Sequence, residues 1–209
     1  MAKTTNYPNN ISHFELWKEI IINPTKTFEK ISRKTKYKNA LFFALKVQAI
    51  SLLALYAFFM VALPFNLIPL AINDSFAATV SGISMIFILF FMLIALPFLL
   101  VLSALGLFIN TLIIHLFVKL VGGKRPYNET FKAISYSMAP TIFAFIPFVN
   151  WAASIYMIVL QVIGISKRQK LSIGKTILAL ILPIILIFIG IFLLLFIIAS
   201  IIILTGGFY

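Results

Sequence analysis

The feature that most restricts this chain is the run 176–204, which contains no charged side chain over 29 residues. A hydrocarbon core of roughly 30 Å needs about 20 helical residues to cross it, so this run can span a bilayer with some tilt. The composition agrees, because 62% of the 209 residues are hydrophobic and only 11% are charged, against about 45–50% and about 25% in soluble domains. We therefore expect an all-α integral membrane protein, a polytopic helix bundle.

Four further apolar segments precede that run, at 40–63, 81–121, 131–146 and 148–166. The segment 81–121 would make roughly 60 Å of helix at about 1.5 Å per residue. It could be one over-long kinked helix or two spans. The pair 131–146 and 148–166 lies near the lower length limit for a span, so a hairpin that only partly crosses is an alternative to two full spans.

The basic residues decide the number of spans. If 81–121 is one helix, all 17 Lys and Arg fall on one side of the membrane: eight in 1–39, Lys46, and four each in 119–132 and 167–175. Cytoplasmic segments carry an excess of Lys and Arg. We therefore predict five transmembrane helices at 40–63, 81–121, 131–146, 148–166 and 176–204, with the N-terminus cytoplasmic and the C-terminus outside.

Prolines indicate where the long apolar stretches change direction. Pro97 is the predicted kink of the 81–121 helix, because a proline inside a helix removes a backbone hydrogen bond and clashes with the preceding turn. The stretch 64–80 contains Pro64 and Pro69 among apolar residues. We expect it to be a loop that caps the outer face.

Residues 1–39 are expected to form a basic cytoplasmic arm ahead of a membrane domain at 40–209. Ser12 followed by Glu15 is a capping box, and it opens an amphipathic helix over 12–22; Asn23-Pro24 predicts a second short helix to about Ser32. The first helix either lies on the cytoplasmic leaflet or folds back onto the end of the bundle. The candidate cytoplasmic contact residues are Phe14, Trp17, Lys18, Lys124 and Arg125.

The composition also excludes several kinds of site. The chain has no Cys, which excludes disulfides, thiolate metal sites and a cysteine nucleophile. Two His and five Asp or Glu are too few and too scattered for most metal or acid–base sites. No Ser–His–Asp set or paired carboxylates occur, and the turn at Gly122-Gly123 lacks the spacing of a phosphate-binding loop. We expect no enzyme activity, no catalytic residue, no metal and no cofactor.

The net charge of +12 would suggest nucleic acid in a soluble protein. In a membrane protein it indicates Lys and Arg that face the cytoplasm and anionic headgroups. The expected partner is therefore the anionic bilayer surface and not nucleic acid.

Uncharged polar residues and prolines at membrane depth either line a cleft or bond one helix to another. No acid lies inside a predicted span, which weakens the case for an ion-coupled transporter. His115 shares a helical face with Thr111 and Lys119, so it is either a proton-responsive group or a contact between helices. The candidate cleft or helix-contact residues are Asn110, His115, Tyr136, Pro140 and Gln161.

Several short motifs occur in a fixed order along the chain. They are Ile22-Asn23-Pro24-Thr25-Lys26-Thr27-Phe28, then His115 with Gly122-Gly123 and Phe131, then Tyr136-Ser137-Met138-Ala139-Pro140 before Ile146-Pro147, and Gly164 ahead of Gly174-Lys175-Thr176. In this order they resemble the YIP family of five-span membrane proteins, which includes the Ypt/Rab-interacting proteins of eukaryotes and many prokaryotic relatives. The resemblance covers most of the chain.

The resemblance implies a non-enzymatic membrane scaffold that pairs with itself or with another membrane protein. Eukaryotic members contact Rab-type GTPases, but this sequence has a short basic arm where they have a long acidic region and an Asp-Leu-Tyr-Gly-Pro stretch. Small GTPase binding is therefore not carried over. The compact form is similar to prokaryotic members and implies a prokaryotic cell membrane. The alternative is a transporter of small molecules or lipids that uses the polar cleft.

Overall fold

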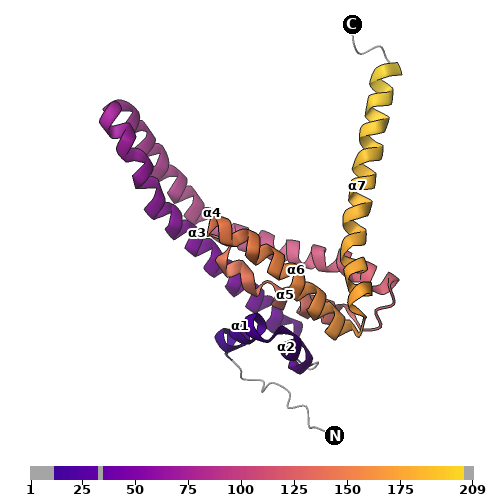
Figure 1. Cartoon of the computed structure of the whole chain (residues 1–209). Coiled ribbons are helices and arrows are strands. Elements are labelled where there is room, and N and C mark those ends of the chain that lie inside the picture. Colours follow the sequence, from indigo (N-terminus) through magenta and orange to yellow (C-terminus); the bar gives the residue numbers. More distant parts are fainter. Residues whose placement is uncertain (1–11, 33–34, 205–209) are drawn as a thin grey trace.

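The computed structural model describes residues 12–32 and 35–204, and every element within these ranges is helical (Figure 1). The predicted all-α class is confirmed. In chain order the elements are α1 (His13–Ile22), α2 (Pro24–Lys30), α3 (Tyr37–Asn73), α4 (Ser75–Leu120), α5 (Tyr127–Ser137), the 3-10 helix η1 (Ala139–Phe143), α6 (Pro147–Gln169) and α7 (Ile173–Leu204).

Four helices in the described part of the chain are long and apolar enough to cross a membrane, where the sequence predicted five. They cover Tyr37–Ala62, Ser75–Leu120, Pro147–Gln169 and Ile173–Ile203. The predicted span 131–146 is the one that differs. It is divided between the 11-residue α5 and the 5-residue η1, and 11 residues make only about 16 Å of helix.

The reason for this difference lies in the polar content of α5. All residues from Glu129 to Ser137 are buried, although they include Thr130, Lys132 and Ser135. A helix with polar groups on every side cannot face lipid, but it can be enclosed by other helices that supply hydrogen-bond partners. The segment is therefore an internal helix of the bundle.

The expected loop at 64–80 is also wrong. Helix α3 continues to Asn73 and α4 begins at Ser75, so the connection is a single residue, Asp74. Its Oδ1 accepts hydrogen bonds from the amides of Phe76 (2.9 Å) and Ala77 (3.0 Å) and thereby caps α4. Helix α3 therefore continues through Pro64 and Pro69.

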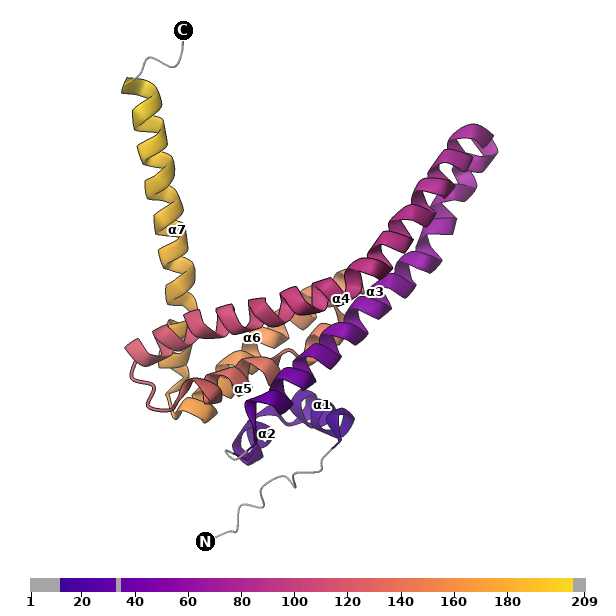
Figure 2. The same ribbon diagram turned by 180° about the vertical axis from the view of Figure 1, so that it is seen from behind.

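Helix α4 is one continuous helix of 46 residues, which confirms the single-helix interpretation of 81–121. Its first part runs beside α3, and its later part turns to lie over α5 and to meet α7 (Figure 2). Pro97 lies inside the helix, and its missing amide hydrogen is a physical cause for this change of direction.

The helices are arranged as a packed base with two extended arms (Figures 1 and 2). The base contains α1, α2, α5, η1 and α6 together with the ends of α3, α4 and α7 nearest to them. One arm is the α3–α4 hairpin and the other is the rest of α7. The α3–α4 turn and the end of α7 point to the same side, away from α1 and α2.

Candidate functional site

Helix α1 is docked onto the base. Its capping box is confirmed, because Ser12 Oγ accepts from the amide of Glu15 (3.2 Å) and Glu15 Oε2 accepts from the amide of Ser12 (3.3 Å). Leu16 and Ile20 are buried in contacts with α2, η1 and α5. Of the two interpretations of this segment, the structure contains the helix that folds back onto the bundle.

Two hydrogen bonds connect α1 to residues that are far from it in the sequence. The indole Nε1 of Trp17 donates to the carbonyl oxygen of Ala139 at 2.8 Å. At the other end of α1, the hydroxyl of Tyr156 donates to the carbonyl oxygen of Ile21 at 2.6 Å. Because the partners belong to η1 and α6, α1 is held by elements that follow it by more than a hundred residues.

The corner between α1 and α2 has its own polar anchor. Thr27 is fully buried, and its hydroxyl lies 2.8 Å from the carbonyl oxygen of Asn23 and 3.1 Å from that of Glu19. Phe28 follows and packs on α6 at Gly164, where an added Cβ would lie 2.9 Å from the ring. The Asn-Pro…Phe motif thus forms a corner that needs a glycine opposite it.

A buried group of three charged side chains lies where α2, α5 and α6 meet. Glu129, Lys132 and Arg168 are 5%, 2% and 3% exposed. Glu129 accepts from Lys132 Nζ at 3.1 Å and forms an ion pair with the guanidinium of Arg168. Arg168 also donates to the carbonyl oxygen of Ile31, at the C-terminal end of α2, where the helix dipole is negative.

One carboxylate is shared by two buried cations in this group. Burial lowers the pKa of Lys132, and the adjacent carboxylate of Glu129 partly offsets this effect. Removing one member of a buried ion pair typically costs more than the pair itself contributes, because it leaves an uncompensated charge. The group therefore makes the joint of α2, α5 and α6 sensitive to any change of charge.

A second polar chain connects α4, α5 and α6. Gln169 Nε2 donates to Thr130 Oγ1 at 2.8 Å, and Thr130 Oγ1 lies 2.8 Å from Nδ1 of His115. The side-chain oxygen of Gln169 accepts from the amide of Arg125 at 3.0 Å. The guanidinium of Arg125 donates to the carbonyl oxygen of Arg168 at 2.6 Å.

The turn between α4 and α5 needs both of its glycines. Gly122 has φ +101°, a conformation that residues with a Cβ rarely adopt. At Gly123 an added Cβ would lie 2.6 Å from Val118 Cγ1 and 2.7 Å from the Val118 carbonyl oxygen. This close turn brings Arg125 and the start of α5 back against α6.

The five candidate cleft residues do not share one cavity. Asn110 is exposed and Gln161 is half-buried, whereas Tyr136 and Pro140 are buried. The Tyr136 ring meets Phe43 edge-on, with centroids 5.2 Å apart. His115 is the helix contact already described, to Thr130 on α5. These separate contacts do not support a polar transport cleft.

The five candidate cytoplasmic contact residues divide into anchors and exposed groups. Phe14 is 71% exposed and stacks on Trp17, with ring centroids 5.9 Å apart. Lys18 and Lys124 are exposed. Trp17 and Arg125, in contrast, are bonded within the base. The structure thus leaves Phe14, Lys18 and Lys124 open to a partner.

Sequence reasoning missed the residues that organise the base. Glu129, Thr130, Arg168 and Gln169 are all buried, and none was a candidate. One signal was present: Glu129 is the only acid that follows Asp74 in the sequence. A single carboxylate beside a basic turn in an apolar chain can be expected to have a buried partner.

The described residues contain no group of three or more His, Cys, Asp or Glu side chains placed to hold a metal ion. Comparison with protein-family models gives one match, described as the Yip1 domain, over residues 18–195. No curated protein and no solved structure matches the chain. Because the family model covers most of its length, the chain belongs to the Yip1 family of membrane proteins, and the resemblance of its motifs is confirmed.

Proposed function

We propose that this member of the Yip1 family is a non-enzymatic integral membrane scaffold that organises membrane partners or lipids at its basic face. The observation that carries the proposal is the docking of α1. Trp17 and Tyr156 hold the helix on the base by hydrogen bonds, while Phe14 stays 71% exposed. A rigid helix that presents an aromatic side chain beside Lys18 is suited to binding a protein or a lipid surface.

The proposed orientation places the basic end of the base at the cytoplasmic surface and the two arms across a prokaryotic cell membrane. The Lys and Arg residues that the structure describes belong to segments at or near the base, and the sequence has none in 64–80 or 205–209, which agrees with the positive-inside tendency. In this arrangement α3, α4 and α7 cross the bilayer. The α5–η1–α6 hairpin enters from the basic side and returns to it, which leaves the N-terminus inside and the C-terminus outside.

Single-cysteine labelling tests the orientation, since the chain contains no native Cys. Ser75→Cys, at the α3–α4 turn, is expected to react with a membrane-impermeant maleimide added to intact cells. Lys170→Cys, at the end of α6, is expected to react only after the membrane is opened. External labelling of Lys170→Cys would contradict the orientation.

Photocrosslinking in native membranes tests the scaffold role. Photoreactive residues at Phe14, Lys18 and Lys124 would be compared with one at Tyr136, which is 2% exposed and serves as the internal control. A reproducible protein partner at Phe14 or Lys18 that is absent at Tyr136 supports the scaffold. Capture of lipid alone at all three exposed positions points to a membrane-surface role without a protein partner.

A further inference from the structure

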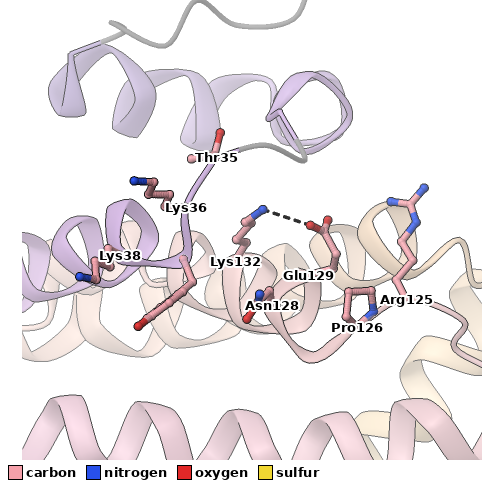
Figure 3. A pocket seen from close by; sticks show the side chains of 9 residues that line it. Thr35, Lys36, Lys38, Arg125, Pro126, Asn128, Glu129 and Lys132 are labelled. Carbon is pink, nitrogen blue, oxygen red and sulfur yellow. Dashed lines mark hydrogen bonds and ion pairs between the residues drawn. The ribbon is translucent and has the colours of Figure 1, made fainter.

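A cavity of about 510 Å³ lies between the segment that leads into α3 and the start of α5 (Figure 3). Four basic residues line it: Lys36 and Lys38 from the first side, and Arg125 and Lys132 from the second. Among the described residues that line it, Glu129 is the one acid. A volume of this size is typical of sites for small molecules.

The acid in the lining does not neutralise the two exposed lysines. The carboxylate of Glu129 is already held by Lys132 and by the buried Arg168, so it has two cations before Lys36 and Lys38 are considered. Buried charges in proteins are usually paired. The cavity therefore has an excess of positive charge that an incoming anion would reduce.

The backbone around the cavity favours an anion as well. The lining includes residues of the first turn of α3, which begins at Tyr37, and of the first turn of α5, which begins at Tyr127. Most first-turn amides have no acceptor within their own helix, although the amide of Glu129 donates to the carbonyl oxygen of Pro126, and the positive end of the helix dipole favours negative charge there. The residue before α5 is Pro126, and no side chain caps this helix.

We propose that this cavity binds the phosphate group of a ligand with net negative charge. Several cations from two sides, two helix N-termini and the neutral side chains of Thr35 and Asn128 suit an oxyanion with many acceptor atoms. The volume exceeds what one phosphate fills, which leaves room for the group esterified to it. The site adjoins Tyr37, the first residue of a membrane-crossing helix, at the level expected for lipid headgroups. The proposal does not depend on the scaffold role.

Binding to the full chain in a neutral detergent at low salt tests the proposal through the change in melting temperature. The probes are short-chain phosphatidylglycerol, short-chain phosphatidylcholine, glycerol 3-phosphate and inorganic phosphate. Phosphatidylglycerol that stabilises the chain where phosphatidylcholine does not identifies an anionic lipid headgroup as the ligand. Equal stabilisation by glycerol 3-phosphate or inorganic phosphate also supports the phosphate site, with a soluble source.

The variant Lys36→Gln/Lys38→Gln removes two exposed charges from the cavity, and both side chains are outside the buried core. We expect it to weaken binding of the effective probe by about tenfold or more. The control Lys26→Gln/Lys175→Gln removes the same charge from exposed positions that do not line the cavity, and its affinity should stay within about twofold. Equal weakening by both variants, equal binding of phosphatidylcholine, or no binding of any probe would overturn the proposal.

Discussion

Helix α5 and the outer part of α7 are opposites in sequence and in surroundings. Residues 129–137 of α5 are all buried and include six charged or hydroxyl-bearing side chains, among them Glu129, Thr130 and Lys132. Residues 184–199 of α7 are all exposed and contain no charged group. The arrangement of soluble proteins, with apolar side chains inside and charged side chains on the surface, is therefore reversed in these two helices. The polar helix is enclosed by protein, because lipid would leave its groups without partners, while the apolar helix needs no protein cover in a bilayer.

The two regions also differ in how strictly their contacts restrict the residue at each position. Apolar contact with lipid is non-directional, so the outer part of α7 is restricted mainly by length and hydrophobicity. The base is held by directed contacts, such as the bonds from Trp17 to Ala139 and from Arg168 to Ile31. We expect substitutions in the base to change stability strongly and those in the outer α7 to change it little.

The largest effect is expected for Glu129→Ala. This change leaves Lys132 and Arg168 buried without their carboxylate, and breaking a buried pair in this way costs about 3–5 kcal/mol. Thermal unfolding in detergent should show a large loss of stability, or no folded protein should be recovered. The isosteric Glu129→Gln, which keeps the shape, should also be destabilised.

Glu29→Ala is the matched control. Glu29 pairs with Lys167 at 2.7 Å, but both side chains are more than a third exposed, and exposed pairs contribute about 0–1 kcal/mol. Similar melting temperatures for Glu129→Gln and Glu29→Ala would contradict the importance of the buried charge group.

The second-largest loss of stability is expected at the contact of α2 with α6. Gly164→Ala places a Cβ 2.9 Å from the Phe28 ring, and the overpacking should exceed the better helix preference of Ala, for a net loss of about 1–2 kcal/mol. Adding Phe28→Leu should recover part of this loss, measured by thermal unfolding. Gly190→Ala, which has no neighbouring atom within 4 Å, should not destabilise the protein.

Trp17→Phe is expected to have a smaller effect, about 1 kcal/mol, because it removes the hydrogen bond to Ala139 while it keeps an aromatic ring. The protein has two tryptophans, so unfolding can be followed through the fluorescence of Trp151. The reciprocal variant Trp151→Phe changes a side chain that is 76% exposed and should leave stability unchanged. Equal losses would show that α1 is not anchored through Trp17.

The smallest effect is expected in the outer α7. Phe192 is 71% exposed, so Phe192→Ala should change the free energy of unfolding by less than about 0.5 kcal/mol. A loss above about 2 kcal/mol in lipid nanodiscs would mean that this face packs on another protein, and it would remove the contrast between the two regions.

Local signals predicted local structure well. The Ser12–Glu15 capping box and the Gly122-Gly123 turn depend on residues a few positions apart, and both are present in the structure. The long helix α4 was also predicted, because placing all Lys and Arg on one side of the membrane leaves only one crossing for 81–121. The prolines were given too much weight at 64–80, because α3 continues through Pro64 and Pro69 to Asn73.

The candidate site was predicted less well. Trp17 was singled out as a cytoplasmic contact, but its partner in the structure is Ala139, 122 residues later, and Arg168 meets Ile31 over 137 residues. No periodicity in the sequence connects positions so far apart. The same limitation made 131–146 resemble a short span, because its apolar count did not reveal that Glu129 and Thr130, just before it, have partners on α4 and α6.

The sequence by itself determined the membrane class, the helical state and the family, because these follow from apolar run length, charge distribution and motif order. Only the tertiary structure decided which helices face lipid and which are enclosed. That choice depends on whether a polar group such as Glu129 finds a partner, and the partner is brought to it by folding. Folding likewise brings Lys36 and Lys38 to the same cavity as Arg125 and Lys132, and so forms a basic cavity from two distant parts of the chain.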